Sequence, residues 1–60
     1  MDIDTDTAHI FHALAVMHGW SSHPTARDGR CYRSPRFPDG SSITVKEDRD
    51  GMATAAWLEI

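Results

Sequence analysis

The chain has sixty residues and one cysteine, Cys31, so it cannot form an internal disulfide. A domain of this size buries only about 60% of the surface that its unfolded chain exposes, and many such domains depend on disulfides, a metal or a partner. Its 40% hydrophobic residues suffice for one thin core. Residues 1–60 are therefore expected to form a single small domain of marginal stability, and a lone thiol fits a reducing cytoplasm.

The amino-terminal third has the periodicity of an amphipathic helix. We expect this helix over about residues 7–18, with Asp6 or Thr5 as its N-cap. Gly19 fits the left-handed residue that ends a helix, and Trp20 fits the hydrophobic residue that folds back on the last turn. One apolar stripe is expected to face the core; its members are Ile10, Phe11, Leu14 and Met17. Aspartates precede the helix where a signal peptide would carry basic residues, so neither a leader nor a membrane span is expected.

The period changes to two at Arg30, which indicates strands. Residues 19–29 are polar and rich in turn formers, so they are expected to form a surface loop. Three strands are expected, over about residues 30–34, 42–47 and 52–59. Asp50-Gly51 suits a two-residue type I′ turn between the last two strands. The predicted fold is α+β, with one N-terminal amphipathic helix packed on a three-stranded antiparallel sheet.

A two-residue turn at Asp50-Gly51 also fixes how the last two strands pair. It places Val45 opposite Ala56 and Ile43 opposite Leu58, and these four residues make one apolar face. That face is the expected seat of Ile10, Leu14 and Met17 on the helix. Which of Cys31 and Tyr32 points inward stays open, because the loop before the second strand does not fix the pairing of the first.

The same pairing places Trp57 opposite Thr44 on the other face of the sheet. If no second layer covers that face, Trp57 is exposed there. Tryptophan is the residue that most often forms the energetic centre of a protein interface. Trp57 is therefore the expected hydrophobic anchor for a partner.

Catalytic and metal-binding patterns are weak in this sequence. His9 and His12 are three residues apart on the predicted helix and can share a metal, with His18, His23 or Cys31 completing the set. No paired cysteines and no HExxH motif accompany them, so the histidines are expected to face solvent or a partner, with no metal and no cofactor. Cys31 is expected to be a packed thiol, because no family signature of a nucleophile surrounds it. The protein is not expected to be an enzyme.

Charged residues give two opposing interpretations. Arginines recur every third residue, beside Tyr32 and Phe37, as in proteins that hold single-stranded nucleic acid; they are Arg27, Arg30, Arg33 and Arg36. However, nine acidic residues against six basic ones give a net charge of -3, which opposes binding to phosphates. The acids form two clusters, which are Asp2, Asp4 and Asp6, and Glu47, Asp48 and Asp50. The alternative without a specific function is that these charges pair with one another and keep a small domain soluble.

A short acidic chain with a helix and a sheet resembles the small inhibitors by which phages and mobile elements block bacterial defence, the anti-CRISPR proteins among them. The resemblance covers length, acidity and layout, and it transfers no site residue. It implies a single domain in the bacterial cytoplasm that docks on a nucleic-acid-binding effector subunit and occludes its DNA site or its neighbouring subunit. Carboxylates can take the place of phosphates in a basic groove, which is nucleic-acid mimicry.

A second resemblance rests on the run HGW and on DGRCYRSPRFPDGSSITV, over about forty residues. Their layout is similar to the helix, Gly-Trp and hairpin of HicA-type mRNA-interferase toxins, which implies an αβββ fold like that of double-stranded-RNA-binding domains. That family cleaves RNA with a histidine in a Gly-Ser-His sequence of the first strand. This chain has Gly29-Arg30-Cys31 there and lacks the family's closing helix, so the resemblance carries the fold without the cleavage.

The function expected from the sequence is a non-enzymatic inhibitor of a nucleic-acid-handling effector. Its partner-binding residues would be Trp57 and the six acids of the two clusters, and direct binding of nucleic acid is not expected. The alternative is an RNA-binding or toxin-like module that uses the four arginines between Arg27 and Arg36. A homo-oligomer, formed by the edge strands or the Trp57 face, is a third alternative because so thin a core benefits from a partner.

Overall fold

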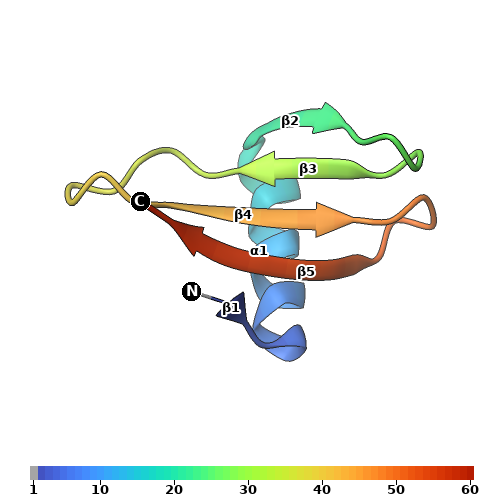
Figure 1. Ribbon diagram of the computed structural model, residues 1–60, viewed down its shortest axis with the longest axis horizontal. Coiled ribbons are helices and arrows are strands. Elements are labelled where there is room, and N and C mark those ends of the chain that lie inside the picture. Colours follow the sequence, from blue (N-terminus) through green and yellow to red (C-terminus); the bar gives the residue numbers. More distant parts are fainter. Residues whose placement is uncertain (1) are drawn as a thin grey trace.

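The computed structural model describes residues 2–60 and shows one helix packed on one face of a five-stranded antiparallel sheet (Figure 1). In chain order the elements are β1 (Asp2–Ile3), α1 (Thr5–His18), β2 (Ser21–Pro24), β3 (Arg30–Arg33), β4 (Ser42–Glu47) and β5 (Ala53–Glu59). In space the strand order is β1-β5-β4-β3-β2, so β2 to β5 form a meander and β1 pairs with β5. Helix α1 crosses behind the strands from β1 to β2 (Figure 1). The α+β class is confirmed.

The prediction of three strands is wrong, because the sheet has five. Residues 19–29 were predicted to form a loop but contain β2, all of whose side chains are exposed. This strand therefore shows no alternation of polar and apolar residues, and it is held by backbone pairing with β3. Strand β1 has two residues, too few for any periodic pattern. Both strands missed by the sequence lie at the edges of the sheet.

The predicted C-terminal end of α1 is confirmed, and the predicted N-terminal end is wrong. The helix begins at Thr5, and its N-cap is Asp4, whose side chain makes no capping hydrogen bond. The predicted cap at Asp6 or Thr5 is therefore wrong by one or two residues. At the other end Gly19 has a φ of 65°, and the Trp20 N–H donates to the Ala15 carbonyl over 3.0 Å, as in a Schellman ending. Within residues 2–60, no helix has the length and apolarity needed to cross a membrane.

The core lies between α1 and the sheet and is built from small residues. Its buried members are Ala8, Ile43, Val45, Ala53 and Ala56, against which Ile3, Phe11, Trp20, Tyr32 and Leu58 pack. The alanines allow the helix to approach the strands closely, and larger residues fill the space around them. Tyr32, and not Cys31, is thus the residue of β3 on the helix side.

The helix presents a different side to the core from the one predicted. Ala8 and Ala15 are buried, whereas Ile10 is 61% exposed and Met17 is 76% exposed. The expectation that Ile10, Leu14 and Met17 sit on the apolar face of the sheet is therefore wrong for Ile10 and Met17, whereas Leu14 is half-buried. Residues two positions apart are about 200° apart around a helix, so burying Ala8 and Ala15 turns Ile10 and Met17 outward. The large residue of the predicted stripe that packs on the core is Phe11.

The pairing of β4 with β5 is confirmed, although the predicted turn is wrong. Ile43 pairs with Leu58, Val45 with Ala56 and Thr44 with Trp57. The turn is a three-residue loop between Asp48 and Met52, in which Gly51 has a φ of 84° and Gly51 N–H donates to Asp48 over 3.0 Å. Such a loop shifts the strands by one residue relative to a two-residue turn. An irregularity between Lys46 and Glu47 shifts them back, as a β-bulge does.

Candidate functional site

The face of the sheet opposite α1, here called the open face, is covered by no other element of residues 2–60 (Figure 1). One row of paired residues runs across all five strands on this face. Directly opposed residues of antiparallel strands point to the same side, and the row consists of Asp2, Trp57, Thr44, Arg33 and Ser21. Trp57 therefore lies on the uncovered side, as predicted. An acidic residue lies on one side of it, and an arginine lies beyond Thr44 on the other.

One hydrogen bond holds the Trp57 ring in this row, and an ion pair holds the carboxylate that accepts it. The indole Nε1–H donates to Glu59 Oε1 at 2.5 Å, and Arg33 forms an ion pair with the other oxygen of that carboxylate at 3.1 Å. The indole hydrogen bond first, and the Arg33 charge second, lower the pKa of Glu59 below its usual value. The carboxylate is thus kept ionised by the groups that it holds in place.

Trp57 is half-buried, although the sequence predicted an exposed ring on an uncovered face. Thr44 is 1% exposed with no helix above it, which means that its neighbours on the open face cover it. Its cross-strand neighbours on that face are Trp57 and Arg33. The arrangement provides a pre-positioned aromatic surface with a charged rim, which is suited to docking.

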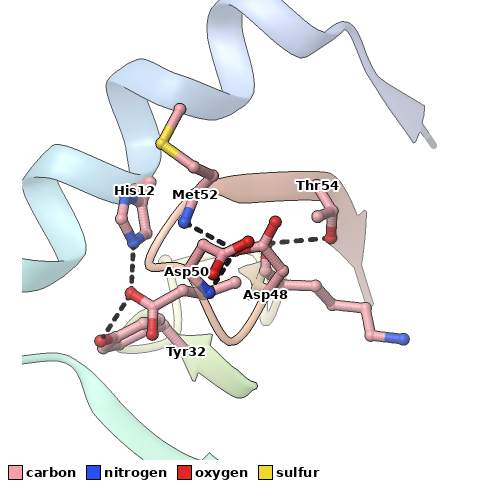
Figure 2. Close-up of polar contacts among 8 residues, drawn as sticks. His12, Tyr32, Asp48, Asp50, Met52 and Thr54 are labelled. Carbon is pink, nitrogen blue, oxygen red and sulfur yellow. Dashed lines mark hydrogen bonds and ion pairs between the residues drawn. The ribbon is translucent and has the colours of Figure 1, made fainter. Parts of the chain in front are cut away.

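The carboxylates of the two predicted acidic clusters have different roles. Asp2 lies beside Trp57 in the row, while Asp4 and Asp6 lie at the start of α1 and are exposed. In the second cluster, Asp48 Oδ1 accepts the backbone N–H groups of Asp50 and Met52, each at 2.9 Å (Figure 2). Asp50 is exposed at the tip of the hairpin. The two clusters therefore do not form one continuous acidic surface.

Glu47, the third member of the second cluster, contacts both α1 and β3 and so holds the helix to the sheet. Its Oε1 lies 2.7 Å from His12 Nε2 and accepts a hydrogen bond from the Tyr32 hydroxyl at 3.3 Å. The rings of His12 and Tyr32 meet edge to face at 5.8 Å. Burial, followed by the charge and hydrogen bond of Glu47, raises the pKa of Tyr32 above its usual value. The contact among His12, Glu47 and Tyr32 has a structural role, because the Glu47 carboxylate engages both the imidazole and the phenol.

His12 therefore faces the sheet, not the solvent or a partner as the sequence predicted. It lies between Ala8 and Ala15, the two buried residues of α1. That position would have identified it if the alanines had been assigned to the core. His9 is exposed, and no group of three or more histidine, cysteine or acidic side chains within residues 2–60 is arranged to hold a metal.

The four arginines of the predicted nucleic-acid site are divided among different parts of the molecule. Arg33 is in the row of the open face, and Arg36 donates to the Gly40 carbonyl in the loop after β3 over 2.8 Å. Arg30 is at the opposite end of β3 and donates to Ser22 Oγ over 3.0 Å. Arg27 is in the loop between β2 and β3. The regular spacing of the arginines thus does not produce a single basic patch.

A cleft that the sequence did not predict lies between the β2–β3 loop and the β4–β5 hairpin. It has a volume of about 760 Å³ and is lined by Thr25, Ala26, Arg27, Asp28, Gly29, Lys46, Glu47, Asp48, Arg49 and Thr54. The loop lies directly on β4, because a Cβ on Gly29 would come within 2.1 Å of the Glu47 carbonyl oxygen. The three basic residues that line the cleft, Arg27, Lys46 and Arg49, make no ion pair within residues 2–60. The cleft therefore offers basic groups from two loops.

Comparisons of the chain with protein families, with curated proteins and with solved structures found no significant match.

Proposed function

We propose that this protein is a non-enzymatic binding protein that inhibits a bacterial nucleic-acid-handling protein, with Trp57 as its anchor. The observation that carries the proposal is the position of Trp57 in the row across the open face, with its indole fixed by Glu59 and Glu59 fixed by Arg33. An aromatic side chain that is already oriented loses little conformational entropy on binding. Burying its remaining surface in a pocket of the partner supplies the affinity.

The charges support a basic surface on the partner. Asp2 pairs with Trp57 across the strands, and the net charge of -3 favours approach to positive potential. A groove that grips phosphates presents lysine and arginine, and it accepts exposed carboxylates such as Asp4, Asp6 and Asp50 in their place. Binding of this kind would occlude the nucleic-acid site of an effector in the bacterial cytoplasm.

The proposal is tested with the Trp57→Ala variant and a matched control, Phe37→Ala, which removes an exposed aromatic ring from the β3–β4 loop. Tagged protein is used to capture partners from nuclease-treated bacterial lysate, and each captured protein is assayed for nucleic-acid binding with and without the inhibitor. Wild type and Phe37→Ala should compete the nucleic acid away. Trp57→Ala should bind at least about thirtyfold more weakly, or roughly 2 kcal/mol.

Two outcomes overturn this proposal. One is that Trp57→Ala, shown to be folded by circular dichroism, competes as well as wild type. The other is that only nucleic acid is captured and that nuclease removes it. The second result would favour direct phosphate binding.

The cleft supports that second function, an RNA-binding module. Arg27, Lys46 and Arg49 line it together with three carboxylates. Two of these are engaged, Glu47 by His12 and Asp48 by backbone N–H groups, and the third is Asp28. A phosphate binder should shift RNA in a gel with a steep dependence on salt. Arg27→Ala should weaken that shift, and Arg36→Ala, outside the cleft, should leave it unchanged.

A further inference from the structure

The outward side of α1 carries an apolar stripe that no other element of residues 2–60 covers (Figure 1). Ile10 is 61% exposed and Met17 is 76% exposed, and the exposed Ala13 and the half-buried Leu14 lie between them at helical spacing. These four residues, here called the outer stripe, occupy positions i, i+3, i+4 and i+7 and so line one side of the helix. Val16, beside the stripe, is 57% exposed. Helix α1 thus exposes large apolar residues and buries two alanines, Ala8 and Ala15.

The helix also lacks the charged residues of an ordinary solvent-facing surface. Between Thr7 and His18 the sequence TAHIFHALAVMH contains no aspartate, glutamate, lysine or arginine. A helix that is apolar on both sides is normally buried on both sides. An exposed apolar stripe of this kind marks an interaction surface.

We propose that α1 pairs with α1 of a second copy of this chain, antiparallel and across a twofold axis near Ala13 and Leu14. Residues opposed across this axis have numbers that add up to 27, so Ile10 of each copy meets Met17 of the other. The outer stripe is therefore self-complementary, as a twofold contact requires. The small side chain of Ala13 at the axis permits close approach of the helices.

The charges of α1 favour antiparallel packing against a second copy over parallel packing or a charged partner. The stripe is uncharged, so two copies bring no like charges together. The antiparallel arrangement sets the positive end of each helix dipole beside the negative end of the other. Asp6, at the start of one helix, comes within about one turn of His18 at the end of the other. The acidic amino terminus of each copy therefore meets the one end of α1 that has a basic side chain.

The length of the contact determines the strength of the expected dimer. The 14 residues of α1 span about 21 Å at 1.5 Å per residue, so two such helices bury less than the roughly 800 Å² per partner of a standard interface. The dimer is therefore expected to be weak and to depend on concentration. Because α1 is on the opposite side of the sheet from Trp57, both open faces remain free and point away from each other. The dimer would thus be bivalent towards any partner of the open face.

Sedimentation equilibrium of the full chain tests the proposal over a range from about 10 to 500 μM, which brackets a dissociation constant of about 100 μM. The mass of wild type should rise with concentration from 6.7 kDa towards twice that value. The double variant Ile10→Glu/Met17→Glu should stay monomeric throughout, because it places carboxylates in the contact. Phe37→Glu, which changes an exposed apolar residue on a loop away from α1, should associate like wild type. A wild-type protein that stays monomeric, or a double variant that associates like wild type, overturns the proposal.

Cross-linking tests the position of the axis. In a Cys31→Ser background, Ala13→Cys should form a disulfide-linked dimer under mild oxidation, while Thr54→Cys, exposed on β5, should not. Equal cross-linking of the two variants would contradict a dimer contact through the middle of α1. A dimer that is lost in Trp57→Ala but kept in Ile10→Glu/Met17→Glu would place the contact on the open face and would also overturn the proposal. Neither result depends on the proposed inhibitory function.

Discussion

Tyr32 is the only tyrosine in the chain, so its ionisation can be followed alone by absorbance near 295 nm. Burial, and then the charge and hydrogen bond of Glu47, raise its pKa above the usual 10.0. The folded protein should therefore titrate with a midpoint above that of the protein in denaturant. Glu47→Gln should lower the midpoint, because it removes the negative charge. The midpoint should stay above the denatured value, because burial remains.

The matched control for this titration is Asp50→Asn, which removes an exposed carboxylate from the same hairpin. It should leave the Tyr32 midpoint where wild type has it. If Glu47→Gln and wild type titrate together, the Glu47 contact with the phenol does not persist in solution.

The inward position of Glu47 was within reach of the sequence. The predicted pairing placed Ile43 and Val45 on the helix side of β4, and Glu47 continues that alternation by two residues. Its place in an acidic run favoured a surface role. However, on the helix side of β4 the Glu47 carboxylate contacts His12 and the Tyr32 hydroxyl. A buried charge that has hydrogen-bond donors is tolerated in a core. That compensation comes from residues 15 and 35 positions away along the chain, which no local pattern reveals.

At the scale of elements, the choice of the buried side of α1 shows what periodicity leaves undetermined. Two stripes fit a helical period, one of large residues around Ile10 and Met17, and one of Ala8, Phe11 and Ala15. Transfer free energy alone favours burying the larger residues. Close packing on the strands favours the alanines, because the sheet side already contributes Tyr32 and other large groups. Periodicity therefore predicted the helix correctly but not its rotation.

Two glycines on loops that flank the cleft should respond differently to alanine. At Gly51 the φ of 84° makes a side chain strained, but no atom lies within 4 Å of its Cβ position. Gly51→Ala should thus lower the free energy of unfolding by about 1 kcal/mol. At Gly29 the Cβ would lie 2.1 Å from the Glu47 carbonyl oxygen. Gly29→Ala must therefore displace the backbone of the loop or of β4, at a cost of about 3 kcal/mol.

Urea denaturation followed by circular dichroism measures both changes. The order of the two values is the decisive result. A Gly29→Ala variant as stable as Gly51→Ala would mean that the β2–β3 loop does not lie on β4. It would also mean that the cleft between the loops is not preformed.

At the scale of the whole molecule, the sequence predicted the helix and the three inner strands because those elements have an alternating or helical apolar pattern. The edge strands β1 and β2 lack such a pattern, since backbone hydrogen bonds hold them and their side chains are mostly polar. Of the candidate site, the side on which Trp57 lies was predicted. Its hydrogen bond to Glu59 was not, because a strand places residues two apart on the same face but does not fix the rotamers that bring the indole and the carboxylate together.

Carboxylates and the phenol together determine how the stability of the whole domain depends on pH. The hydrogen bond of Trp57 lowers the pKa of Glu59 below 4.5, and the hydroxyl and N–H of Ser41 lower the pKa of Asp39 below 3.8. A lowered pKa stabilises the folded state above the unfolded value, and this contribution is lost as the pH falls through the folded value. Tyr32 acts in the opposite sense. Its pKa is raised above 10.0, so its contribution is present below that pH and is lost above it.

The melting temperature should therefore be highest and nearly constant with respect to these groups between about pH 5 and pH 9.5, and should fall on both sides. Thermal melts followed by circular dichroism, at constant ionic strength from about pH 2 to pH 11, would measure the melting temperature over roughly the range in which carboxylates and tyrosine titrate. Glu59→Gln should make the acid side less steep, with the Asp39 contribution remaining, and should leave the alkaline side unchanged. Asp50→Asn, which removes an exposed carboxylate away from α1, should reproduce the wild-type curve. If Glu59→Gln loses stability in acid as steeply as wild type, the carboxylate does not hold Trp57 in solution, and the anchor of the open face is not pre-positioned.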